Sequence, residues 1–237
     1  MKVKVSLRMA IAVLSLISAL GLAASARADS ITFTFSGSDT DGPVSGEAAI
    51  TTSANEVTVT ITDLQGNIVS IGQAISGLSF TLTGGSASTA TLSSMLGNSI
   101  TVNGNKSVTS NGASTTGWGL EGSGTTLNLE AAGKGHFGNL SNFEILGAPC
   151  AGGTYCDANG SIAGNTAHNS LFNGTVTFVI SINGVTSSTG ITGADMSFGT
   201  GPEITLAGAP TPEPASMVLF GTGLLLLGVK SRRRPKA

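Results

Sequence analysis

The segment "EVTVTITD" (residues 56–63) decides the fold class, because apolar residues alternate with threonine along most of its length. Successive side chains of a β-strand point to opposite faces of the sheet, so this alternation indicates a strand with one buried and one exposed face. Threonine is β-branched and polar, which suits the exposed face of such a strand. The segment therefore predicts a strand at the surface of a layered β-structure.

The same alternation recurs along the chain, in "ITFTF" (31–35), "LSFTLT" (78–83), "TLNLE" (126–130) and "TVTFVISI" (175–182). Turn signals rich in glycine and asparagine separate these segments. We expect a final short strand over residues 203–206, a short turn near Ser93–Leu96, and a brief linker over residues 207–211. This arrangement predicts an all-β single domain, built as an antiparallel β-sandwich or a jelly-roll-like fold over residues 29–209.

The first 28 residues have the three parts of a secretory signal peptide. These parts are the basic residues Lys2, Lys4 and Arg8, the apolar residues 9–22, and a cleavage site with the small residues Ala26 and Ala28. We expect export by the Sec machinery and cleavage after Ala28, which leaves Asp29 as the mature N-terminus. The alternative is an uncleaved N-terminal anchor, which the short apolar run disfavours.

The chain ends in "PTPEPASMVLFGTGLLLLGVKSRRRPKA" (residues 210–237), where a proline-rich stretch, an apolar run and a basic tail follow one another. As a helix, the apolar residues 215–229 would rise about 22 Å, which is less than the roughly 30 Å of a hydrocarbon core. Long basic side chains can reach the interface and place the C-terminus on the cytoplasmic side. In the tail over residues 230–237 these are Lys230, Arg232, Arg233, Arg234 and Lys236. The pattern predicts a transmembrane helix over 215–229, with the body outside.

Pro212-Glu213-Pro214 stands directly before the apolar run. The two prolines fix φ and push the residues before them into extended backbone, so the tripeptide cannot join the helix. Extended backbone at the bilayer surface is what a protease or transpeptidase site accepts. The alternative is a plain C-terminal anchor preceded by a proline-rich spacer.

These three parts, in this order at the chain end, resemble the PEP-CTERM sorting signal of Gram-negative bacteria. The resemblance implies that exosortase, a membrane enzyme similar to a cysteine transpeptidase, reads the tail and processes the protein near the tripeptide. It also implies a bacterium that makes exopolysaccharide, biofilm or floc. The segments "ISGLSFTL" (75–82) and "GWGLE" (117–121) resemble those of Gly/Ser/Thr-rich β domains that commonly precede this tail, which implies a fold and a compartment but no reaction.

Without its two targeting segments, the chain is strongly acidic. Residues 29–209 contain twelve carboxylates and two lysines, a net charge of −10. Such a body has almost nothing with which to neutralise phosphates, so nucleic acid and anionic lipid are excluded as partners. The charge suits solubility outside the cell, and it is also compatible with divalent cations.

Cys150 and Cys156 enclose five residues. An even pair of cysteines in an exported protein predicts a disulfide that closes a small loop. The alternative, a metal site, lacks both the usual zinc spacing and a histidine nearby in sequence.

The segment "SDTDG" (38–42) contains two carboxylates, Asp39 and Asp41, that could bind calcium. Pro43 breaks the pattern of an EF-hand loop, so the segment is better explained as a turn before the strand that begins near Ser45. We therefore expect no metal site and no cofactor.

No catalytic residues are predicted. The two histidines, His136 and His168, stand among ordinary loop residues, and no Gly-x-Ser-x-Gly segment supplies a nucleophile. Glu121, Glu130 and Glu144 could meet in space as the carboxylates of a glycosidase, but nothing in the sequence selects them.

Trp118, the only tryptophan, is either a platform that stacks on sugar rings or an anchor in the core. The features of the chain together predict an exported, non-enzymatic surface or extracellular-matrix protein, associated with biofilm or exopolysaccharide. Its expected partners are exosortase, the Sec machinery, the inner membrane as a transient anchor and exopolysaccharide. The alternative is a secreted polysaccharide-binding protein or a polysaccharide-acting enzyme, which would need a cleft that gathers Trp118, a histidine and two carboxylates.

Overall fold

A computed structural model describes residues 29–131, 142–200 and 204–211. The predictions for the signal peptide, Pro212-Glu213-Pro214, the transmembrane helix, the basic tail and His136 lie outside these residues. Strands dominate the described part of the chain, and its only helices are two single 3-10 turns. The prediction of an all-β fold is confirmed.

The described residues form thirteen strands. They are β1 (Asp29–Asp39), β2 (Gly42–Ser53), β3 (Glu56–Asp63), β4 (Ile75–Leu82), β5 (Thr91–Val102), β6 (Val108–Ser114), β7 (Gly119–Ser123), β8 (Thr126–Glu130), β9 (Ile145–Leu146), β10 (Leu171–Ser181), β11 (Ile191–Phe198), β12 (Ile204–Ala207) and β13 (Ala209–Thr211). The two 3-10 turns are η1 (Ile71–Gln73) and η2 (Ala87–Thr89).

The described strands pair into one open sheet in the order β12-β11-β4-β9-β10-β3-β2-β1-β13. Two branches leave this path, because β5 and then β6 follow from β10, while β8 and then β7 follow from β4. The sheet is mixed and not purely antiparallel as predicted, since β9 runs parallel to β10. The two-residue strand β9 joins the halves of the sheet, because Ile145 pairs with both Ile75 of β4 and Phe172 of β10.

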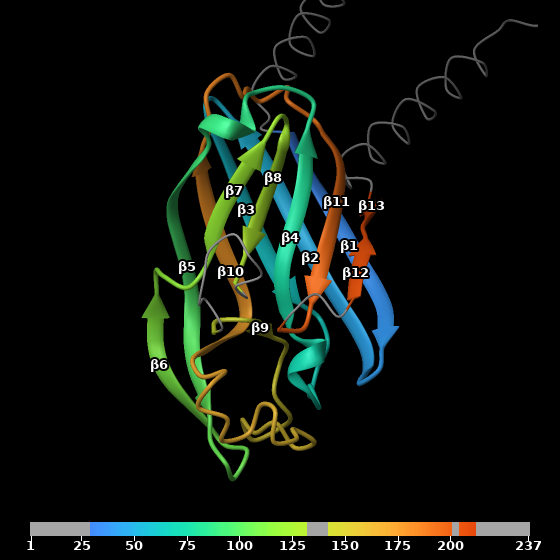
Figure 1. Cartoon of the computed structure of the whole chain (residues 1–237), viewed down its shortest axis with the longest axis vertical. Helices are drawn as coiled ribbons and strands as arrows, with labels where there is room; N and C mark the ends of the chain where they lie inside the picture. Colours follow the sequence, from blue (N-terminus) through green and yellow to red (C-terminus); the bar gives the residue numbers. More distant parts are fainter. Residues whose placement is uncertain (1–28, 132–141, 201–203, 212–237) are drawn as a thin grey trace, which may run out of the picture.

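The sheet bends so that β4, β8 and β11 lie over β1, β2 and β3, as Figure 1 shows. The main core lies between these layers and includes Phe33, Val59 and Phe178 from one layer and Phe80 and Met196 from the other. The layers approach closely at Gly46 of β2, where an added Cβ would lie 2.5 Å from Met196 Sδ.

β3 has the bounds that its alternating sequence predicts. Val57, Val59 and Ile61 are fully buried, while the intervening threonines occupy the outer face of the layer. Thr60 pairs with Thr177 of β10, and their hydroxyl oxygens lie 3.3 Å apart. The alternation therefore separates a buried apolar face from an outer face of paired hydroxyl groups.

A second, smaller core lies beneath the loops that precede β10, and it includes Ile68, Leu146, Tyr155 and Leu171. Tyr155 is fully buried, and its hydroxyl donates a hydrogen bond to the carbonyl oxygen of Gly147 at 2.7 Å. These contacts hold the irregular segment between β9 and β10 against the sheet.

Two local predictions were wrong. Ser93–Leu96 is part of the long strand β5, because Met95 is buried while β5 pairs with β10 on one side and β6 on the other. The expected linker over residues 207–211 contains the end of β12 and the strand β13. The predicted strand over 203–206 corresponds to β12.

Candidate sorting site

The last described strand, β13, lies on the edge of β1 and ends immediately before Pro212. It pairs antiparallel with β1 in the register Thr32 to Thr211, Phe33 to Pro210 and Thr34 to Ala209. The Thr211 hydroxyl donates to the carbonyl oxygen of Thr32 at 3.0 Å. The segment that leads into the C-terminal tail is thus part of the sheet.

Gly208 lets the chain pass from β12 to β13. Its N–H donates to the carbonyl oxygen of Ala194 in β11 at 2.8 Å. A Cβ at this position would lie 2.7 Å from the Phe35 ring and 3.0 Å from Phe33 Cβ. Only a residue without a side chain allows this close approach to the core, so Gly208 fixes where β13 begins.

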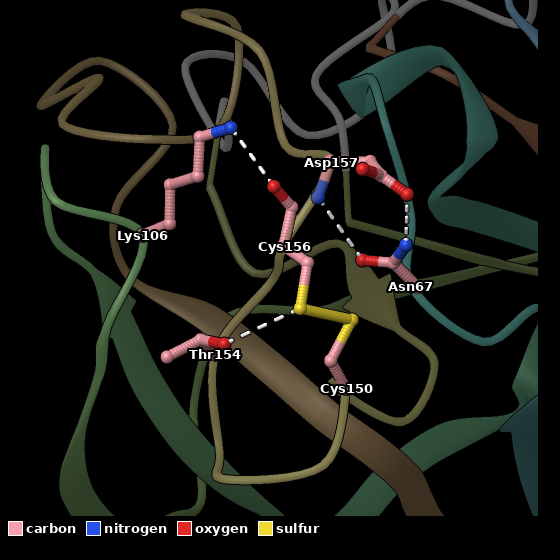
Figure 2. The surroundings of a disulfide bond; sticks show 6 residues. All are labelled: Asn67, Lys106, Cys150, Thr154, Cys156 and Asp157. Atoms are coloured by element: carbon pink, nitrogen blue, oxygen red, sulfur yellow. Dashed lines mark hydrogen bonds between the residues drawn. A yellow bond between two sulfur atoms is a disulfide. The ribbon is translucent and has the colours of Figure 1, made fainter.

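Cys150 and Cys156 form the predicted disulfide. Figure 2 shows how neighbouring side chains surround it, with Lys106 Nζ donating to the carbonyl oxygen of Cys156 at 2.9 Å. Asn67 and Asp157 hydrogen-bond to each other beside the loop, across Cys156 from Lys106. The disulfide loop is therefore held to the turn between β5 and β6 and to the segment after β3.

Replacing both cysteines, as C150S/C156S, is expected to lower the free energy of unfolding by about 2 kcal/mol, because the closed loop is short. Denaturant unfolding monitored by circular dichroism would measure this loss. The wild-type protein with its disulfide reduced is the control and should match the variant. Equal stability of the oxidised wild type and the variant would contradict the prediction.

Asp39 stabilises the turn between β1 and β2. Its Oδ1 accepts hydrogen bonds from the backbone N–H groups of Asp41 and Gly42 at 2.7 and 3.0 Å. An open hollow of about 760 Å³ lies beside this turn and reaches Ile204. Within the described ranges, no group of three or more His, Cys, Asp or Glu residues gathers as metal ligands. The two hydrogen bonds that Asp39 accepts support the turn interpretation.

Trp118 is an anchor in the core and not a surface platform. Only 5% of it is exposed, and its ring centroid lies 5.1 Å from that of Phe178. Its indole N–H donates to the carbonyl oxygen of Phe143 at 2.8 Å. The alternative of a sugar-stacking face at Trp118 is wrong, because neither face of the ring is open.

The three candidate glutamates lie in different surroundings. Glu121 and Glu130 occupy the outer face of β7 and β8, whose inner face carries the buried Leu127 and Leu129. Glu144 precedes β9 and is fully buried. His168 lies in the loop before β10, where its backbone N–H donates to the carbonyl oxygen of Asn165 at 3.2 Å. Since Trp118 is in the core, it does not line a surface cleft with these residues.

Two carboxyl groups, Asp63 and Glu144, are buried, although neither was predicted to be. Burial raises the pKa of Glu144 to about 7, and neither of its carboxyl oxygens has a hydrogen-bond partner among the described residues. Burial also raises the pKa of Asp63 well above its usual value, although backbone N–H groups of Gln65 and Gly147 donate to it. The pKa of Tyr155 is raised by burial and by the nearby charge of Asp63.

Signals for both groups were present in the sequence. Asp63 lies two residues after Ile61 and continues the alternation of Val57, Val59 and Ile61. This spacing places its side chain on the buried face of the strand. Glu144 stands between Phe143 and Ile145, in a short segment that is otherwise apolar.

The described ranges contain no helix with the length and apolarity that a membrane span requires.

The fold and its C-terminal connection define an all-β domain whose last strand leads directly into a short proline-rich, apolar and basic tail. Residues 210–234 match the family model of the PEP-CTERM protein-sorting motif. The chain therefore carries this sorting motif, which confirms the resemblance of its C-terminal residues to the PEP-CTERM signal. The motif supports export and exosortase-dependent sorting. Neither the curated proteins nor the solved structures include a match to the chain.

The match begins at Pro210, the middle residue of β13. The first two residues of the sorting motif, Pro210 and Thr211, are thus paired with β1 as part of the folded domain.

Proposed function

We propose that this protein is an exported, non-enzymatic surface or extracellular-matrix protein that exosortase processes at or near Pro212-Glu213-Pro214. The observation that carries the proposal is the sorting motif at residues 210–234, which begins within β13, the last described strand of the folded domain. The signal peptide would direct the chain to the Sec machinery. Residues 215–229 would then hold it in the inner membrane, with the body in the periplasm, until processing releases it to the surface or the medium.

The surface chemistry of the domain supports a role in a hydrated matrix of biofilm and exopolysaccharide. Residues 29–209 carry a net charge of −10, which favours a soluble and mutually repelling surface. The outer face of β3 and β10 presents threonine pairs whose hydroxyl oxygens lie 3.1 to 3.3 Å apart. We propose that the two facing layers act as a β-sandwich, which displays these hydroxyl groups to neutral polysaccharide.

Mass spectrometry of the protein from a Gram-negative host tests this proposal. In cells with active exosortase, we expect a chain that begins at Asp29 and lacks Arg232, Arg233 and Arg234. Cells without exosortase should accumulate the chain with its basic tail. An intact basic tail in cells with active exosortase would contradict the proposed function.

The variant Glu213→Ala is expected to accumulate unprocessed in the exosortase-active cells, because it alters the centre of the tripeptide. Its matched control is Glu56→Ala, which removes an exposed carboxylate at the start of β3. The control should be processed like the wild type. Normal processing of E213A would show that the tripeptide is not the recognised element.

A further inference from the structure

Pairing with β1 occupies backbone groups of β13 that a processing enzyme would need. Enzymes and domains that bind a peptide as an extended strand use its main-chain N–H and C=O groups. Pro210 and Thr211 belong to the matched motif, yet both are paired with β1 in the folded domain. The residues directly before the tripeptide therefore have one backbone edge turned toward β1.

The pairing of β13 with β1 is short. Pro210 has no N–H, so the opposed residues Phe33 and Pro210 cannot exchange two backbone hydrogen bonds. The ladder bonds must be made by the pairs on either side, Thr32 with Thr211 and Thr34 with Ala209. All three residues of β13 are exposed. Short, exposed strands with few bonds are the parts of a fold that open most easily.

The connection before β13 is firmer than β13 itself. Gly208 is hydrogen-bonded to Ala194 and lies close to the ring of Phe35 and the Cβ of Phe33 in the buried core. A release of β13 can therefore end at Gly208 without disturbing β11 or β12. Along the chain, Gly208 is thus anchored to the core, the three residues of β13 can separate from β1, and the tripeptide follows them.

We propose that β13 must separate from β1 before the sorting motif can be processed, so that the folded domain controls access to its own tail. This inference rests on the proposed function, since exosortase is the enzyme that would need the released strand. The paired state occupies the backbone of Pro210 and Thr211, the first two residues of the motif, and the opening of β13 frees it.

A reversible crosslink tests the proposal in the full-length chain. The double variant T32C/T211C places two cysteines at directly opposed positions of β1 and β13. In exosortase-active membranes, we expect the oxidised variant to be processed at least about tenfold more slowly than the wild type, and a reductant to restore its rate. Mass spectrometry of the tail over time gives both rates.

The matched control is T60C/T177C, because Thr60 and Thr177 are also opposed across neighbouring strands, on β3 and β10. This crosslink leaves β13 free, so its oxidised form should be processed like the wild type. Wild-type processing of oxidised T32C/T211C would overturn the proposal. An equal loss in both crosslinked variants, or a loss that the reductant does not reverse, would also overturn it.

Hydrogen exchange gives a second measurement that does not depend on exosortase. We expect the amide of Thr211 to exchange at least about a hundredfold faster than that of Val59, which lies in a buried strand. Equal protection of the two amides would overturn the proposal. If the wild type keeps its tail in exosortase-active cells, the proposed function fails as well. If the wild type is processed and oxidised T32C/T211C is processed equally fast, only the proposed role of β13 fails.

Discussion

Replacing Trp118 with alanine is expected to lower the free energy of unfolding by about 3–5 kcal/mol, which is the usual loss for a large buried aromatic side chain. The ring packs against Phe178 in the main core, and its N–H satisfies the carbonyl oxygen of Phe143. The variant therefore leaves both a cavity and an unpaired carbonyl group. Denaturant unfolding of the purified domain would measure the change.

Trp118→Phe separates these two effects. It keeps an aromatic ring but removes the N–H donor, so we expect a smaller loss of about 1–3 kcal/mol. A polysaccharide pull-down with W118A should equal that of the wild type at temperatures where both are folded. Wild-type stability together with lost polysaccharide binding would restore the surface-platform interpretation of Trp118.

Glu144→Gln is expected to stabilise the protein at pH 8 by up to about 3 kcal/mol and to have little effect near pH 4. The pKa of Glu144 is about 7 in the folded chain, against an ordinary value of 4.5. Between these values the folded state retains a proton that the unfolded state has lost. The free energy of unfolding therefore falls as the pH rises from about 4.5 to 7, and glutamine removes this contribution.

Thermal or denaturant unfolding across pH 4–8 would measure the difference. Part of the pH dependence should remain in E144Q, because the pKa of Asp63 is also raised by burial. The matched control, E56Q, removes an exposed charge and should change stability by less than about 0.5 kcal/mol. A pH profile of E144Q that parallels that of the wild type would contradict the buried position of this carboxyl group.

The strands that could be predicted are those with a complete alternation of apolar and polar residues. β3 and β8 have the predicted bounds, because each has one buried face and one outer face along its whole length. The disulfide was also predictable, since Cys150 and Cys156 are close in sequence and form it within one local loop.

Three of the strands that were missed, β6, β9 and β13, carry no such periodicity. β6 is exposed or half-buried throughout, so it has no apolar face to detect. β9 has two residues and β13 has three, which is too short for any period. β9 and β13 pair with strands far away in sequence, and no local pattern specifies those partners.

The parts of the candidate site that are contiguous in the sequence could be predicted. The tripeptide, the apolar run and the arginines are contiguous, and residues 210–234 match the sorting motif. The surroundings of Trp118 and Glu144 are set by long-range packing, so the sequence left the role of Trp118 open, and only the apolar neighbours of Glu144 indicated that it is buried. The attachment of the motif to β1 was hidden for the same reason.

The contact between Thr211 and Thr32 spans 179 residues, so it joins the two ends of the domain. If the chain crosses the membrane N-terminus first, β1 emerges early and β13 emerges last. Hairpins such as β1–β2 can form while synthesis and export continue, but the outer edge of β1 must wait for its final partner. Non-local contacts of this kind form late in folding. The domain thus has a built-in order of assembly, in which the pairing of β13 with β1 completes this edge of the sheet only after the entire body has been delivered.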